Sequence, residues 1–178
     1  MSNEPETDSY PIESTLAVSA AEIAAAWQRE LPGTQTGSIL VITPLWRVAK
    51  TLADERRRLL QLLDVEPATL DLLSTLRRAG EPYELTTRQI TERTLVTAGA
   101  VSQRIARAER AGLVTRSSSP ASRRAVAVTL TAAGHHLIES TVRDLLAHEA
   151  ALISTLDQSE QVALGTLLAR LHDDLSNR

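Results

Sequence analysis

The chain has 178 residues, which is enough for one domain with a hydrophobic core and additional helices. Its net charge is −3 and 43% of its residues are hydrophobic, but only 2% are aromatic, so a core has to be built from Leu, Ile, Val and Ala, which suits helices. The absence of cysteine excludes disulfides, thiolate metal sites and thiol-based redox sensing.

The N-terminal segment has no features of an export signal. Residues 1–13 lack periodicity, and we expect them to form a disordered tail. They are also polar and acidic, whereas a signal peptide would be basic and then apolar. The longest apolar run is far shorter than the roughly 18 residues that a transmembrane helix requires. We therefore expect a soluble, cytoplasmic protein without a membrane partner, with residues 14–178 as its folded domain.

Two helices are predicted in the first third of the chain. Ser19 and Glu22 have the spacing of a capping box, which opens a helix that Pro32 and Gly33 end. A long helix is predicted over residues 37–63, where apolar residues recur at helical spacing. Pro44 lies inside this pattern and should either kink the helix or mark its true start.

Two shorter helices follow. Pro67 lies in the first turn of one of them, a usual position for proline, and Gly80 ends it. Its leucines at 70, 73 and 76 give it one apolar face. Thr86 and Gln89 have the spacing of a second capping box, which starts the next helix.

A further helix and a hairpin complete the centre of the chain. The helix is predicted over residues 97–111, with Gly112 as its C-terminal cap. Residues 113–117 and 124–130 predict two strands, joined by a loop of turn-forming residues. This order of helix, turn, helix and hairpin is typical of a winged helix-turn-helix, which places its second helix in the major groove of DNA.

The charge of the chain is segregated in a way that supports this interpretation. Residues 84–126 contain eight arginines and three acidic residues, a net charge of +5 within an acidic protein. A basic face of this kind can neutralise the phosphates of a nucleic acid, and we expect double-stranded DNA as the partner.

The helix over residues 97–111 has one apolar stripe, Val101, Ile105 and Ala108, and presents polar side chains opposite it. Gln can pair with adenine and Arg with guanine, and small residues let a helix enter the groove. An arginine of the hairpin could enter the minor groove. An ordinary amphipathic surface helix and a solvated turn remain the alternatives. The candidate DNA-binding residues are Thr86, Thr97, Ala98, Gly99, Ala100, Ser102, Gln103, Arg104, Arg107, Arg110, Arg123 and Arg124.

Two helices are predicted at the C-terminal end. Thr131 is the N-cap of a helix that runs to about Leu156, and Asp157 and Glu160 form a third capping box that opens the last helix. The predicted fold class is mainly α with a small β-hairpin wing. The helices of residues 37–63, 132–156 and 158–175 carry more leucine than one small domain can bury, which indicates a dimer interface, with a self-contained bundle as the alternative. Residues 19–63 and 132–176 are therefore the predicted dimerisation helices.

Residues 37–178 resemble the MarR family of winged helix-turn-helix transcription regulators. The resemblance rests on residues 82–86, on GAVSQRIARAERAGLVTR at 99–116, on SRRAVAVTLT at 122–131, and on the turn from Thr131 to Gly134. Ser122 stands where the family usually has an Asp in the wing. The resemblance implies residues 64–131 as the winged domain, and a homodimer whose two recognition helices lie about 34 Å apart on a palindromic site.

The front helix with Trp27 is similar to a MarR subgroup that responds to urate and related purine-derived ligands. That subgroup has an acidic segment after the tryptophan helix and two arginines on the long helix. Here Gln35 and Pro44 replace two of the expected residues, and Arg47 occupies the second arginine position. These departures argue against urate. Trp27 is interpreted as a packing anchor between subunits or as a ligand contact.

The hypothesis is a ligand-responsive repressor that a small aromatic or anionic molecule releases from DNA. The candidate ligand-binding residues are Trp27, Trp46, Arg47, Arg78 and His135. We expect no cofactor, no metal site and no enzymatic activity, because the chain has no G-x-G-x-x-G run and no catalytic Cys, and the pair His135-His136 has no metal-ligand spacing. The alternative is a winged helix used for protein contacts or dimerisation, without sequence-specific DNA binding. The operator, the target genes and the choice between repression and activation are not encoded in any pattern of the chain.

Overall fold

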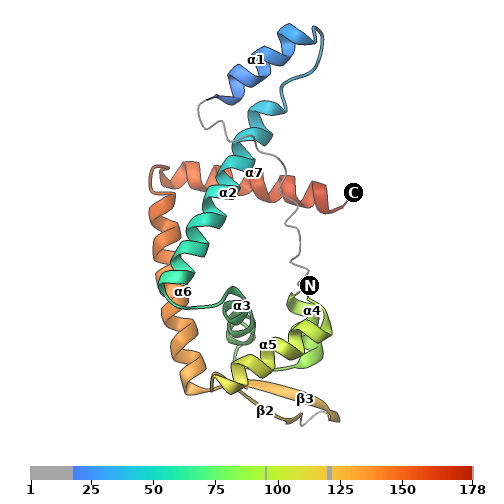
Figure 1. Ribbon diagram of the computed structural model, residues 1–178, viewed down its shortest axis with the longest axis vertical. Helices are drawn as coiled ribbons and strands as arrows, with labels where there is room; N and C mark the ends of the chain where they lie inside the picture. Colours follow the sequence, from blue (N-terminus) through green and yellow to red (C-terminus); the bar gives the residue numbers. More distant parts are fainter. Residues whose placement is uncertain (1–17, 95, 120–121, 178) are drawn as a thin grey trace, which may run out of the picture. The chain divides into compact units, whose positions relative to one another are not determined.

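The computed structural model describes residues 18–94, 96–119 and 122–177 (Figure 1). The predicted disordered tail, residues 1–13, lies outside the described residues. The chain divides into two units, Met1–Leu59 and Leu60–Arg178. The helices in the described part are α1 (Ala20–Glu30), α2 (Ile39–Leu62), α3 (Pro67–Arg77), α4 (Thr87–Thr94), α5 (Ala98–Arg110), α6 (Ala132–Leu152) and α7 (Gln158–Ser176). The strands are β1 (Glu84–Thr86), β2 (Val114–Ser119) and β3 (Ser122–Leu130).

The first unit contains α1 and most of α2. The predicted capping box of α1 is confirmed, because Ser19 Oγ accepts a hydrogen bond from Glu22 N and the Glu22 carboxylate accepts one from Ser19 N. Pro44 lies inside α2, so of the two predicted alternatives the one in which it marks the start of the helix is wrong. The first turn is already formed ahead of the proline, since Val41 N and Ile42 N both donate to Ser38 O.

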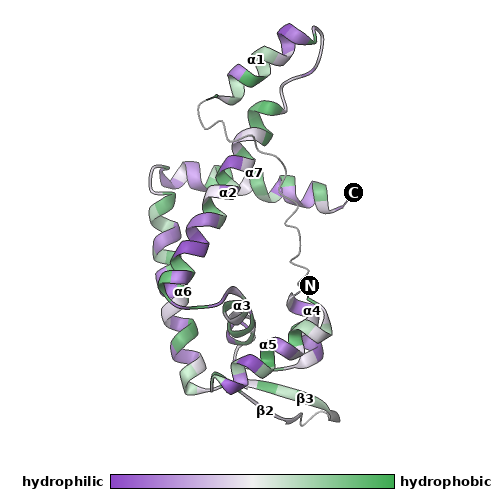
Figure 2. Ribbon diagram, in the orientation of Figure 1, coloured by the Kyte–Doolittle hydropathy of each residue, from purple (hydrophilic) through white to green (hydrophobic). Residues whose placement is uncertain are grey.

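The core of the second unit lies between α3, α4, α5, α6 and the sheet. Its most deeply buried side chains are all aliphatic, as the composition predicted. Hydrophobic and polar residues alternate along α5 and α6, as expected for helices with one buried face (Figure 2). The large side chains that are less than 2% exposed are Leu72, Leu73, Leu76, Ile90, Val101, Ile105, Val114, Val128 and Ile138.

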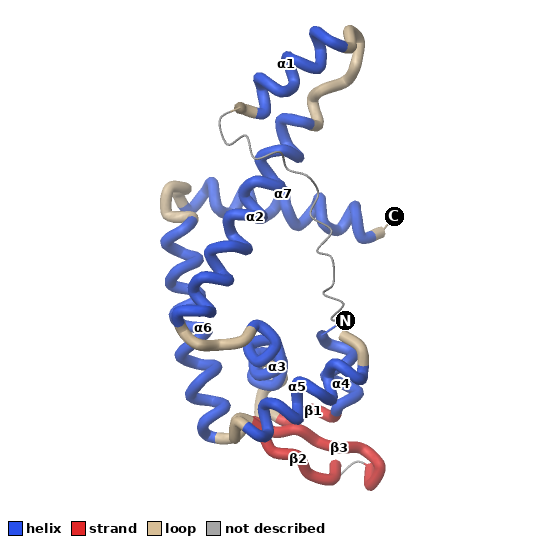
Figure 3. Tube along the Cα trace, viewed as in Figure 1, coloured by secondary structure: helices blue, strands red, loops and turns tan. Residues whose placement is uncertain are grey.

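The sheet has three antiparallel strands in the order β1-β3-β2 (Figure 3). The hairpin of β2 and β3 is the predicted wing, and both strands are longer than expected. The sequence analysis missed β1. This strand has three residues, too few for an alternating pattern, and it exists only because Leu85 pairs with Val128 of β3, far along the chain.

The wing and α6 meet in a close backbone contact at the end of β3. Thr131 Oγ1 donates to Gly112 O at 2.7 Å and accepts from Gly134 N at 3.0 Å, and it is the N-cap of α6 as predicted. A Cβ atom at Gly134 would lie 2.1 Å from Leu113 O, so only glycine fits there. Gly112 adopts φ +71° after α5, which confirms it as the residue that ends this helix.

The two C-terminal helices differ from the prediction at one boundary. α6 ends at Leu152, four residues before the expected end near Leu156. In the turn that follows, Gln161 Nε2 donates to Leu156 O at 2.9 Å and binds a carbonyl that no helix satisfies. The capping box of Asp157 and Glu160 at the start of α7 is confirmed. None of the described helices is long and apolar enough to cross a bilayer.

Candidate DNA-binding surface

The apolar stripe of α5 holds this helix against the rest of the second unit. Val101 and Ile105 are each 1% exposed and Ala108 is 2% exposed, which confirms the predicted buried face. The Thr97 hydroxyl accepts a hydrogen bond from Ala100 N and caps the helix. Both ends of α5 are therefore fixed, by Thr97 at one end and by Gly112 beyond the other.

The opposite side of α5 is open to solvent. Gln103, Arg107 and Arg110 are exposed there, as the helical periodicity predicted. Ala98, Gly99 and Ser102 are exposed near the N-terminal end, and a Cβ atom at Gly99 would meet no other atom. This end of the helix is narrow and unobstructed, which is the shape that entry into a major groove requires.

Thr86 belongs to the start of α4 and not to the face of α5. Thr86 N and Thr86 Oγ1 both donate to Gln89 Oε1, at 2.8 and 2.9 Å, and Gln89 N donates to Thr86 Oγ1. The second predicted capping box is thus confirmed. It fixes the first turn of α4, while Ile90 anchors this helix in the core.

Four arginines of the basic segment are paired with carboxylates. Arg104 Nη1 lies 3.4 Å from Asp71 Oδ2, and Arg107 pairs with Glu66. Arg88 and Arg116 are the other two. Arg88 pairs with Glu92 at 2.8 Å, and Arg116 pairs with Glu109 and lowers the pKa of that carboxyl.

The sequence analysis missed Glu66 and Asp71 as neighbours of the basic helix. They lie 41 and 33 residues before their arginine partners, outside the segment whose charge was +5. Only the packing of α3 beside α5 brings them there, and no local pattern reports it. Within the part of the chain that is described, Arg93 and Arg110 form no ion pair.

Arg123 and Arg124 lie in strand β3 beside the tip of the wing. Their side chains, and those of the neighbouring residues 119–122, fall outside what the structure describes. Their assignment to the flank of a DNA site stays a prediction.

Three of the five candidate ligand residues belong to the first unit. Arg47 Nη2 donates to Val18 O at 2.9 Å, which ties α2 to the residues before α1. Trp27 is 50% exposed and Trp46 is 47% exposed. An exposed Trp27 ring can serve either of its two predicted roles, as a packing anchor or as a ligand contact, and the exposed Trp46 ring is available as a ligand contact.

The other two candidates, Arg78 and His135, belong to the second unit. Arg78 is exposed and its Nε donates to Ser74 O at 3.2 Å. The His135 ring packs edge-on against Tyr83, with 4.6 Å between the ring centroids.

Arg77, which the sequence analysis passed over, is the arginine that joins the cluster around Tyr83. It lies 4.5 Å above the Tyr83 ring and pairs with Glu139 at 2.9 Å. The Tyr83 hydroxyl, and then Glu139, raise the pKa of Arg77 above its ordinary value. The distinction between Arg77 and Arg78 depends on which side of α3 packs against α6, and two adjacent arginines carry no such signal in sequence. No group of metal-ligating side chains occurs in the part of the chain described.

Comparisons with known proteins agree with this geometry. Residues 63–125 match the model of the MarR family. The chain is similar to the transcriptional regulator PecS of Dickeya dadantii, with 29% identity over 157 residues that cover 88% of this chain and 95% of the relative.

Two solved structures extend the similarity to the fold. The structure of BpsR of Bordetella bronchiseptica, which concerns regulation of its DNA binding by 6-hydroxynicotinic acid, is 26% identical, with a TM-score of 0.64 over 79% of this chain and 99% of that one. The DNA complex of Sco3205 of Streptomyces coelicolor is 23% identical, with a TM-score of 0.67 over 80% and 89% of the two chains, and shows likeness of fold alone. The chain therefore carries a segment, residues 63–125, that matches the MarR family of transcriptional regulators, and it has the winged helix-turn-helix fold.

Proposed function

We propose that the protein is a homodimeric repressor that binds a palindromic promoter site and is released by a small aromatic or anionic molecule. The exposed row of Gln103, Arg107 and Arg110 on α5, opposite a fully buried stripe, is the observation that carries the DNA-binding part of this proposal. Amide and guanidinium groups at one-turn spacing match the donor and acceptor pattern of base edges in the major groove.

The other candidate DNA contacts support this face. Thr97, Ala98, Gly99, Ala100 and Ser102 form the narrow end of α5 that would enter the groove, and Thr86 and Arg104 would contact the flanking backbone. Arg123 and Arg124 would bind the adjacent minor groove. A phosphate contact fixes the register of the protein, while a base contact selects the sequence.

The homodimer is supported by apolar side chains that the single chain does not bury. α7 has no buried residue in the described chain, and Leu164, Leu167 and Leu168 are among its exposed side chains. In the first unit, Trp27, Leu31 and Leu40 are about half exposed. Exposed apolar surface of this kind marks an interaction site, and we assign the exposed apolar side chains of the helices in residues 19–63 and 132–176 to the dimer interface.

The effector class rests on the candidate residues Trp27, Trp46, Arg47, Arg78 and His135, which offer aromatic and cationic groups. The BpsR relative, whose DNA binding 6-hydroxynicotinic acid regulates, gives a precedent for an aromatic acid. A coupling free energy of about 1–3 kcal/mol between effector and DNA would change DNA affinity by roughly 5- to 150-fold.

A salt-dependent binding assay with the DNA upstream of the protein's own gene tests the proposal. We expect selective binding over a scrambled duplex of equal length and composition. Gln103→Ala and Arg107→Ala should abolish the selectivity while sedimentation still shows a dimer. Arg143→Ala, an exposed arginine of α6, is the matched control and should leave binding intact. Equal binding of the two duplexes by the wild-type protein would instead favour a protein-interaction module.

A further inference from the structure

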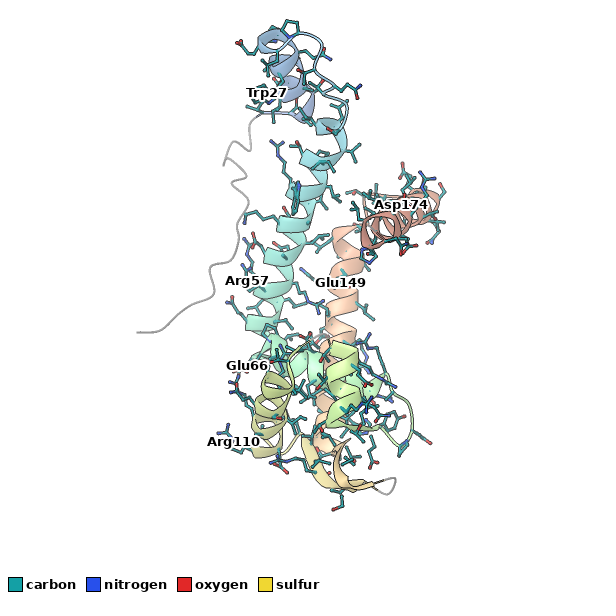
Figure 4. The ribbon with its side chains drawn as sticks, turned by 90° about the vertical axis from the view of Figure 1, so that its right-hand side faces the viewer. Trp27, Arg57, Glu66, Arg110, Glu149 and Asp174 are labelled. Carbon is teal, nitrogen blue, oxygen red and sulfur yellow. The ribbon has the colours of Figure 1, made fainter. Side chains whose placement is uncertain are left out.

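Two arginines of the DNA-facing helix have carboxylates as neighbours on one flank. Arg107 pairs with Glu66, the residue before α3, and Arg104 pairs with Asp71, in α3 itself. Figure 4 shows Glu66 on the same side of the second unit as Arg110, the last residue of α5. We call Glu66 and Asp71 the acidic edge of α3.

The Glu66 side chain binds Arg107 and does not cap its own helix. It occupies the N-cap position of α3, where a side chain usually accepts a hydrogen bond from the first turn, yet its side chain makes no such bond. The carboxylate reaches across to α5 instead. Its charge therefore acts on the arginine row of α5.

The pair of Arg107 and Glu66 is weak enough for DNA to displace it. The Arg107 and Glu66 side chains are 59% and 57% exposed, and ion pairs with that exposure are screened by water and salt. Phosphate oxygens and the acceptor atoms of base edges both offer Arg107 an alternative partner on DNA. The Glu66 carboxylate and DNA therefore compete for one guanidinium.

We infer that the acidic edge of α3 competes with DNA for Arg104 and Arg107, which lowers the attraction of α5 for nucleic acid of any sequence. This inference rests on the proposed DNA-binding function. In the unbound protein, Glu66 and Asp71 neutralise Arg107 and Arg104. A duplex must displace these carboxylates before it gains the two arginine contacts, so contacts by Gln103 and Arg110 carry more of the binding.

Neutralising the acidic edge tests the inference. Glu66→Gln and Asp71→Asn are expected to tighten binding about two- to fivefold each, the range set by exposed ion pairs. The slope of log affinity against log salt should steepen, by at most about 0.9 for each arginine released to a phosphate. Asp54→Asn is the matched control, because it removes one carboxylate from exposed ion pairs on α2 and should leave affinity and slope unchanged. Affinities are measured by fluorescence anisotropy on the upstream duplex and on its scrambled counterpart.

A double variant shows whether Glu66 acts through Arg107. In an Arg107→Gln background, Glu66→Gln should have no effect on affinity. A gain that persists there would mean that Glu66 repels the duplex directly, and a loss of affinity in Glu66→Gln alone would mean that the carboxylate orients Arg107 for binding. Either result overturns the inference, as does an equal gain in Asp54→Asn.

The outcomes separate this inference from the proposed function. If the wild-type protein binds both duplexes equally, the proposed sequence-specific regulator is refuted. The role of the acidic edge is still decided in that case, by the ratio of the Glu66→Gln affinity to the wild-type affinity on the scrambled duplex. If neither wild type nor Glu66→Gln binds any duplex, both are refuted. Thermal unfolding of each variant checks that the fold is intact, and Asp71→Asn provides an independent test if Glu66→Gln unfolds.

Discussion

Helices α5 and α7 have similar N-caps and similar apolar periodicity, but they differ in how far their own chain buries them. Each starts with a side-chain N-cap, Thr97 in α5 and Asp157 in α7, and each has apolar residues at helical spacing. The apolar stripe of α5 is fully buried by its own chain, whereas α7 has no buried residue in the described chain. Amphipathic periodicity therefore predicts a helix and its apolar face, but not whether residues of the same chain bury that face.

The difference between the two helices separates two kinds of stability. Residues packed around α5 should determine how stably one chain folds. Residues on α7 should determine association, if the proposed dimer is correct. Substitutions on the two helices can therefore be used to break or sharpen the comparison.

The largest effect is expected for Ile105→Ala in α5. Ile105 is 1% exposed, and truncating a buried isoleucine leaves a cavity, so we expect the free energy of unfolding to fall by about 2–5 kcal/mol. Urea denaturation followed by circular dichroism measures this change. Ala106→Gly, on the half-exposed flank of the same helix, is the control and should cost only about 1 kcal/mol. Equal losses in the two variants would show that the stripe is not a core element.

Gly134→Ala should have the next largest effect. Its methyl group would lie 2.1 Å from Leu113 O, a backbone atom, so the start of α6 or the turn after α5 has to shift. We expect a loss of about 1–3 kcal/mol in the free energy of unfolding, as for other overpacked sites.

Gly165→Ala in α7 is the matched comparison for Gly134→Ala. A Cβ atom at Gly165 would meet nothing within 4 Å, so the exchange should stabilise the helix by about 0.5–1 kcal/mol. Opposite signs in thermal unfolding of the two variants are the expected result. A loss at both positions would mean that the α7 backbone at Gly165 is covered by another chain.

The helices and caps of this fold were predictable because their signals are local. Capping boxes at Ser19, Thr86 and Asp157 located three helix starts, and periodicity located the buried face of α5. The same local signals were too weak for β1, whose three residues become a strand only by pairing with β3.

The candidate site was predictable in its residues but not in its electrostatics. Gln103 and Arg107 were placed on the outer face of α5 by the helical repeat alone. The partners Glu66 and Asp71 come from α3, and their proximity is a product of tertiary packing. The cluster of Arg77, Tyr83 and His135 was missed for the same reason, because its members come from three separate segments.

Leu168→Glu on α7 tests the association side of the comparison. Leu168 is 41% exposed in the single chain, so the substitution should disturb the isolated chain little. In a dimer interface it would place a charge against apolar side chains, and we expect the dimer dissociation constant to rise at least about tenfold, which corresponds to about 1.4 kcal/mol. Sedimentation equilibrium measures it. An unchanged dissociation constant, or a wild-type protein that is monomeric, would contradict the assignment of α7 to the interface.

The smallest effect is expected from acid, and it distinguishes the N-caps of the two helices. Asp157 caps α7 by accepting hydrogen bonds from Glu160 N at 2.9 Å and from Ser159 Oγ at 2.7 Å. The hydrogen bond from Glu160 N, followed by that from Ser159 Oγ, lowers the pKa of the Asp157 carboxyl. A depressed pKa in the folded state contributes stability above the ordinary Asp value of about 3.9, and this contribution is lost as the pH falls through the lowered value. The Thr97 hydroxyl that caps α5 does not titrate in this range.

NMR titration of backbone amides below about pH 4 measures this difference between the caps. The Glu160 amide should shift with a midpoint below the ordinary Asp value, while the Ala100 amide at the cap of α5 should not follow that step. Asp157→Asn keeps an amide oxygen as the cap, so the helix should persist at neutral pH and the step at Glu160 should disappear. If the step survives in Asp157→Asn, it does not arise from the N-cap carboxylate. The predicted contrast between the N-caps of α5 and α7 would then be refuted.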